Sequence, residues 1–205
     1  MKRWFRLLIG AASLFGLAGC GHLEGYLDIT REKGMSAEYL TVLNRWTRSQ
    51  TVYSQFETRA HISATYRSPE FKEAYLREYA RLYQLDEGEK KARREIQESL
   101  KSDFIEFIFY AYIPEKASND FDRQGSIWSI FLIGAKGERI DPVEVRRIDP
   151  MTPIITEFYP YANPYYGISY QLRFPPLTKI GSAAGPLRLV FASVIGKVEL
   201  EFGGR

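Results

Sequence analysis

Few side chains in this sequence have the chemistry that catalysis or metal binding usually requires. The chain contains two histidines, His22 and His61, and one cysteine, Cys20. Zinc sites need several Cys or His ligands. A Ser-His-Asp triad would have to use His61, and no sequence motif identifies a serine as its partner. The sequence has no glycine-rich phosphate loop, G-x-S-x-G motif or H-E-x-x-H motif. We therefore predict a protein that has no catalytic residues, no metal site and no cofactor.

Two other groups of charged residues have simpler structural interpretations. Asp141 and Asp149 could form a pair of carboxylates for acid–base chemistry, but each precedes a proline, and Asp-Pro is typical of turns. The basic run 90–94 is flanked by glutamates at helical spacing, which favours a solvated helix face over a site for anionic head groups. We expect turns at Asp141 and Asp149 and an exposed helix over residues 90–94.

The first twenty residues differ in composition from the rest of the chain. Three basic residues within the first six precede an uncharged stretch, residues 7–19. As a helix this stretch would be about 20 Å long, which is short for a hydrocarbon core of about 30 Å. A basic start, an apolar middle and a small-residue exit are typical of an export signal. The segment ends at residues 17–20 in Leu-Ala-Gly-Cys, which resembles the lipobox of bacterial lipoproteins.

The resemblance implies that a diacylglyceryl group is attached to the sulfur of Cys20 and that a peptidase cuts between Gly19 and Cys20. The new amino group would then be acylated, for example with palmitate. Two or three acyl chains would anchor the protein stably, since each buried methylene contributes about 0.8 kcal/mol. The residue that follows the lipidated cysteine is Gly21, which resembles the residue at this position in lipoproteins sorted to the outer membrane. The alternative is an ordinary cleaved signal or an uncleaved anchor in which Cys20 is incidental.

The charge of the predicted mature chain argues against nucleic acid as a partner. The full sequence has a net charge of +3, and the signal holds three basic residues and no acidic one. The mature chain would therefore be neutral, with no general attraction to a polyanion. With its one cysteine lipidated it would have no internal disulfide, so packing alone would hold the domain together.

Hydrophobic periodicity predicts helices in the first half of the mature chain. Ser36 is a good N-cap for a helix that should end near Ser49. Ser68-Pro69-Glu70 is typical of a helix start, and the aromatic residues that follow recur every four positions, which favours packing onto a sheet over a lipid- or partner-facing surface. Asp86 and Glu89 have the spacing of a capping box, which predicts a second helix to about Leu100.

Period-two alternation predicts strands elsewhere. Residues 52–66 alternate throughout and are interpreted as one long strand with a bend or bulge, with His61 on its exposed polar face. Further alternating segments lie within 105–113, 128–132, 143–145, 168–174, 187–191 and 198–202. Antiparallel strands separated by turn sequences favour a sandwich.

We predict a mostly β fold: an antiparallel immunoglobulin-like β-sandwich with an N-terminal helix and a helical hairpin inserted after the first strand. A small β-barrel is the alternative. The predicted organisation is a signal peptide at 1–19, a lipidated tether at 20–35 and one sandwich domain at 36–205, with the helical insertion at about 69–101.

One aromatic loop, residues 158–167, is the candidate contact surface. Its four tyrosines are interspersed with two prolines, and rigid aromatic side chains lose little entropy on binding. The candidate contacts are Tyr159, Tyr161, Tyr165 and Tyr166. The alternative is a loop that packs against the edge of the sandwich.

The expected function is that of a non-catalytic lipoprotein of the bacterial envelope. Acyl chains on Cys20 would hold it on a membrane, with the periplasmic face of the outer membrane as the expected location, where it would contact an envelope protein partner and no nucleic acid. The alternative is a carrier or enzyme acting on a lipid or glycan, with a pocket between the sandwich and the helical insertion.

Overall fold

The computed structural model describes residues 34–99, 104–134, 136–176 and 186–203. From Met35 onward these residues belong to one compact unit, Met35–Arg205. The predicted signal peptide, with Gly19, and the lipidation site Cys20 lie outside the described residues. No helix within the described ranges is long and apolar enough to cross a bilayer.

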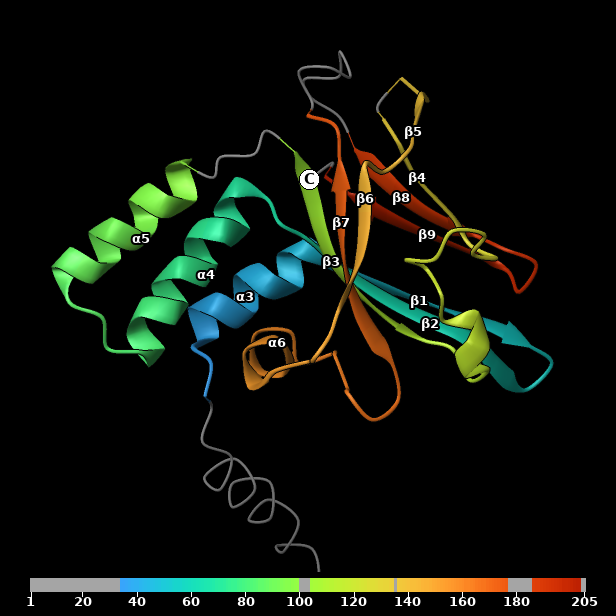
Figure 1. The fold of residues 1–205 in the computed structure, drawn as a ribbon, viewed down its shortest axis with the longest axis horizontal. Coiled ribbons are helices and arrows are strands. Elements are labelled where there is room, and N and C mark those ends of the chain that lie inside the picture. The colour runs from blue at the N-terminus through green and yellow to red at the C-terminus, as the bar shows by residue number, and fades with distance from the viewer. Residues whose placement is uncertain (1–33, 100–103, 135, 177–185, 204–205) are drawn as a thin grey trace, which may run out of the picture. The chain divides into compact units, whose positions relative to one another are not determined.

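The described strands form two antiparallel sheets (Figure 1). A five-stranded sheet has the order β1-β2-β3-β7-β6, and a four-stranded sheet has the order β5-β4-β8-β9. The chain passes between the sheets after β3, β5 and β7. The strands are β1 (Thr47–Ser54), β2 (Glu57–Tyr66), β3 (Ile105–Tyr112), β4 (Ser129–Ile133), β5 (Arg139–Ile140), β6 (Glu144–Ile148), β7 (Ile168–Phe174), β8 (Leu187–Ala192) and β9 (Lys197–Phe202).

The first of two hydrophobic cores lies between the sheets. Alternate residues of β2, β3, β4, β7, β8 and β9 point into it, as the period-two pattern predicts. The Phe109 ring on β3 stacks on Tyr170 of β7 at 4.8 Å and contacts Phe191 of β8 at 5.0 Å, which joins the two sheets. Each such ring, fully buried, contributes about 1.5–3 kcal/mol.

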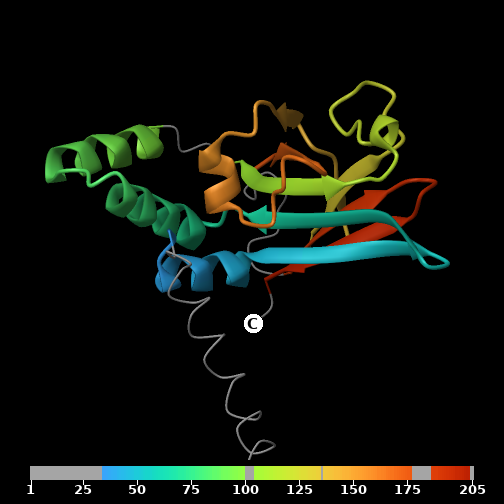
Figure 2. The same ribbon diagram turned by 90° about the horizontal axis from the view of Figure 1, so that it is seen from below.

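The second core lies on the opposite face of the five-stranded sheet, beneath three helices (Figure 2). The helices are α3 (Ala37–Trp46), α4 (Pro69–Leu82) and α6 (Pro153–Phe158). Their buried residues Tyr39, Phe71 and Phe158 pack with Ile108 of β3. The Tyr39 hydroxyl donates to the carbonyl of Phe158 at 2.8 Å, so the buried phenol is satisfied. Strand β3 is thus covered on both faces.

Ser36 both caps α3 and fixes it to α4. Its hydroxyl accepts from the Tyr39 amide at 3.2 Å. Its own amide and hydroxyl donate to the two oxygens of Glu78, each at 2.7 Å. Burial opposes ionisation of Glu78, but hydrogen bonds from Arg81 and Ser36 outweigh it and hold the pKa of this carboxyl below its usual value. The N-cap that the sequence predicts at Ser36 is confirmed, and α3 ends at Trp46 rather than near Ser49.

The segment interpreted as one long strand is a hairpin, so that interpretation is wrong. Strands β1 and β2 pair antiparallel across a turn at Gln55 and Phe56. A bulge between Val52 and Tyr53 sets Val52 opposite Ala60. Even-numbered residues therefore lie on the same face of the sheet before and after the turn. For this reason apolar and polar residues alternate in the sequence without interruption. The helical insertion consequently follows the second strand, not the first.

The insertion consists of α4 and α5 (Glu87–Ser99). Ser68 accepts from the Phe71 amide at 3.1 Å, and Pro69 occupies the first turn. The Asp86–Glu89 capping box is confirmed, since each side chain accepts from the other residue's amide, at 2.8 and 3.0 Å. The predicted packing of the α4 aromatic residues is confirmed for Phe71, which is buried, and for Tyr75, which packs on Phe158 at 4.3 Å, whereas Tyr83 at the end of the stripe is 49% exposed.

The fold class is therefore mixed, with two antiparallel sheets packed face to face and helices on one outer face. The described strands do not close into a barrel, so the small-barrel alternative is wrong. A sandwich is compatible with this arrangement.

Candidate functional site

Within the described ranges, no group of three or more His, Cys, Asp or Glu side chains is placed to hold a metal ion. His61, expected on an exposed face, is half-buried, and its two ring nitrogens lie 2.8 Å from the Thr51 hydroxyl and 3.1 Å from the Ser63 hydroxyl. Burial lowers the pKa of His61, which favours the neutral imidazole. These contacts give His61 a structural role between two strands.

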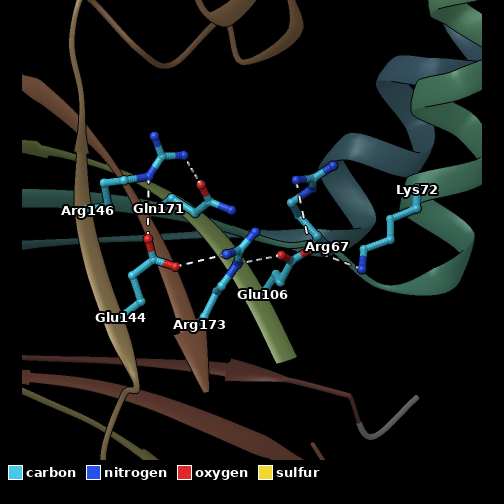
Figure 3. Close-up of polar contacts among 7 residues, drawn as sticks. All are labelled: Arg67, Lys72, Glu106, Glu144, Arg146, Gln171 and Arg173. Atoms are coloured by element: carbon cyan, nitrogen blue, oxygen red, sulfur yellow. Dashed lines mark hydrogen bonds and ion pairs between the residues drawn. The ribbon is translucent and has the colours of Figure 1, made fainter. Parts of the chain in front are cut away.

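A charged cluster lies on the outer face of the five-stranded sheet, beside the start of α4 (Figure 3). At its centre is Glu106 of β3, whose side chain is only 7% exposed. Lys72 of α4 lies 3.1 Å from one carboxylate oxygen, and Arg173 of β7 lies 2.9 Å from the other. Arg67 is 3.9 Å away. One buried carboxylate therefore faces three cations.

The cluster continues across β7 to the edge strand β6. Arg173 also bonds Glu144 at 2.9 Å, and Arg146 lies 3.6 Å from the other oxygen of Glu144 (Figure 3). Arg146 also donates to the amide oxygen of Gln171. Each acidic side chain is thus shared between cations on different elements, which joins β3, β6, β7 and the start of α4.

The electrostatics of this cluster do not suit acid–base chemistry. Burial opposes ionisation of Glu106, but Arg67, Lys72 and Arg173 outweigh it and hold the pKa of this carboxyl below its usual value. Glu106 is therefore ionised at neutral pH and cannot serve as a proton donor there. The arrangement is that of a structural clamp.

The aromatic loop divides into a buried base and an exposed tip. Tyr159 is 3% exposed and belongs to the helical core. The hydroxyl of Tyr161 lies 2.8 Å from that of Thr65 and donates to the Ile108 carbonyl at 3.4 Å. Burial raises the pKa of both phenols, so both stay neutral. Tyr159 is therefore an anchor of the loop, and its prediction as a partner contact is corrected, whereas Tyr161 is half-buried and held by its hydrogen bonds.

Tyr165 and Tyr166 form the exposed tip. Their side chains are 85% and 65% exposed, which is unusual for rings of this size. Asn163 orders the backbone: its side chain accepts from the Tyr165 amide at 2.9 Å, and its carbonyl accepts from the Gly167 amide at 3.2 Å. The loop thus holds two solvated aromatic side chains on an ordered backbone.

Gly167 allows this loop to approach the sheet closely. A Cβ at this position would lie 2.4 Å from a ring carbon of Tyr110 and 2.5 Å from the carbonyl oxygen of Ala111. Any other residue would have to displace the loop or β3. Gly167 therefore sets the position from which Tyr165 and Tyr166 project.

No family model, curated protein or solved structure matches this chain. Its functional interpretation therefore depends on the residues themselves.

Sequence reasoning did not separate the two halves of the aromatic loop. The missing element was α6, whose last residue Phe158 is buried and draws Tyr159 into the core. A signal was present, because Thr152-Pro153 has the form of an N-cap followed by proline. With only six residues, α6 shows no amphipathic repeat that would identify its buried side.

Proposed function

We propose that this chain is a lipid-anchored lipoprotein of the bacterial envelope whose folded domain binds a protein partner and does no chemistry. Acyl chains on Cys20 would hold it on a membrane, and the expected location is the periplasmic face of the outer membrane. The lipobox-like sequence at residues 17–20 supports the anchor.

The observation that carries the binding role is the exposed aromatic tip. Tyr165 and Tyr166 are solvated in the isolated chain, whereas Tyr159 at the base of the loop is buried and Tyr161 is half-buried and hydrogen-bonded. Ordered aromatic side chains bury large areas at little entropic cost, and tyrosine is enriched among residues that dominate binding energy. We expect the partner to be a protein with a small surface that covers the rings of both tyrosines.

We also propose that the sandwich is immunoglobulin-like. Support comes from two antiparallel sheets packed around one inter-sheet core and from connections that pass from one sheet to the other. The helical insertion and α6 would be additions to that sandwich.

The binding role can be tested by photo-crosslinking in cells. A photoreactive phenylalanine analogue at position 165 should yield a defined protein adduct, identified by mass spectrometry. In a second experiment, Tyr165→Ala/Tyr166→Ala should reduce recovery of that same protein about tenfold or more, because loss of a dominant contact costs about 2 kcal/mol or more.

The matched control is Tyr53→Ala/Phe56→Ala, which removes two exposed aromatic side chains from the β1–β2 hairpin. This variant should leave recovery of the partner unchanged. Equal recovery with the Tyr165/Tyr166 variant, or equal loss with the control, would contradict the proposed contact.

A further inference from the structure

The two helices of the insertion are joined by charged side chains rather than by a packed apolar seam. All described side chains of α5 from Glu87 to Ile96 are exposed except Lys90, which is half-buried. Arg94 bonds Glu73 of α4 at 3.1 Å, and the Arg93 guanidinium lies 3.9 Å above the Tyr79 ring. Long cationic side chains thus span the space between the helices, where a helical hairpin normally places apolar side chains.

A groove of about 480 Å³ results between α4 and α5. This volume lies within the range of small-molecule sites, which is roughly 300–1,000 Å³. Its apolar lining includes Leu76 of α4 and Leu85 of the connecting turn, both half-buried. Its charged lining comprises five cationic side chains and one acidic one, Glu87.

Among the described residues that line the groove, cations outnumber acidic side chains. Glu73 is shared by Arg77 at 3.8 Å and Arg94 at 3.1 Å. Glu87 pairs with Lys90 at 2.7 Å, and Glu78 pairs with Arg81 at 2.7 Å. Three carboxylates thus pair with four of the five cations, and the fifth, Arg93, lies over an aromatic ring. A positive excess beside an apolar lining is complementary to an anion that carries an apolar tail.

We propose that the α4–α5 groove binds an anionic amphiphile, a molecule with one phosphate head group and a single alkyl chain. The phosphate lies among Arg77, Lys90 and Arg94, and the chain lies along Leu76 and Leu85. Arginine suits this role because its planar guanidinium can bond two phosphate oxygens at once. This site is independent of the tyrosine tip and of the lipid on Cys20.

Native mass spectrometry of the full chain, kept in the uncharged detergent dodecyl maltoside, tests the proposal with two added probes. Dodecyl phosphate should bind as one molecule per chain, and inorganic phosphate should bind at least tenfold more weakly. Dodecyl maltoside has the same alkyl chain without the charge and should leave no stoichiometric adduct. Absence of a dodecyl phosphate adduct, or equal binding of inorganic phosphate, would overturn the proposal.

Paired variants separate a specific site from general electrostatic attraction. Arg77→Gln/Lys90→Gln should weaken dodecyl phosphate binding about tenfold or more, because it removes two charge-assisted contacts. Lys91→Gln/Lys136→Gln removes the same charge from exposed positions outside the groove lining and should change binding less than about twofold. Equal weakening by both variants would mean non-specific attraction, and no weakening by the first would exclude the groove. Leu76→Asn should weaken dodecyl phosphate without affecting inorganic phosphate.

Discussion

Glu106 lies on the outer face of the five-stranded sheet, and its carboxylate is nevertheless buried. Burying a carboxylate is costly, and the cost is offset here because Lys72 and Arg173 bond it while Arg67 lies nearby. The three cations are themselves 24–37% exposed, so water can partly solvate them if the acid is lost. The net contribution of Glu106 should therefore be moderate.

Glu106→Gln should lower the free energy of unfolding at pH 7 by about 2 kcal/mol, since it removes charged hydrogen bonds from a buried position. The folded-state pKa of Glu106 is depressed, so its stabilisation is present above the pKa of an unfolded glutamate, about 4.3, and disappears as the pH falls through the folded value. Urea unfolding at pH 7 and pH 3 measures both effects, and the difference between wild type and variant should be smaller at pH 3 than at pH 7.

The comparison variant is Glu144→Gln. Glu144 is 35% exposed, so its ion pairs should be worth less than about 1 kcal/mol. Equal destabilisation by the two substitutions, or a Glu106→Gln effect that is as large at pH 3 as at pH 7, would contradict the role assigned to the clamp.

Among the elements, the β1–β2 hairpin depends most on backbone conformation. Gln55 has φ of 55°, in the left-handed region that residues with a Cβ rarely adopt. The turn places Thr47 and Ser49 of β1 beside Thr65 and Ser63 of β2, and each pair of hydroxyls is hydrogen-bonded, at 2.7 and 2.8 Å. The polar face of β2 is thus partly buried without leaving these hydroxyls unsatisfied.

Gln55→Val distinguishes a hairpin from a continuous strand by the sign of its effect. In the hairpin, a β-branched residue at positive φ is strained and should destabilise the domain by about 1–2 kcal/mol. In a continuous strand the same change would raise β-propensity and stabilise. Thermal unfolding measures the outcome, with Ser54→Val in the adjoining strand as a control that should be neutral or slightly stabilising.

The elements that could be predicted from sequence are those whose pattern of residues is explained by a single local feature, such as one buried face or one helix cap. Strand β7 alternates because one of its faces covers the inter-sheet core, and the start of α5 is set by the reciprocal bonds of Asp86 and Glu89. The turn at Gln55 was missed because the nearby bulge preserves the alternation. The buried base of the tyrosine loop was missed because burial of Tyr159 depends on Phe71, a residue distant in sequence.

On the scale of the whole domain, one sheet supports two cores. Its inner face packs on the four-stranded sheet, and its outer face packs on α3, α4 and α6. The clamp, the tyrosine tip and the α4–α5 groove all lie on elements of this outer side or its insertion. The clamp stabilises the fold, and we propose that the tip binds a partner and the groove binds a ligand.

We propose that lipid on Cys20 attaches this domain to a membrane, and the mass of the N-terminal peptide tests this proposal most directly. Mass spectrometry of protein isolated from its native envelope should find Cys20 as the first residue, carrying a diacylglyceryl thioether and an acylated amino group. A free Cys20 thiol, within an intact leader or in a chain cut elsewhere, would contradict the account.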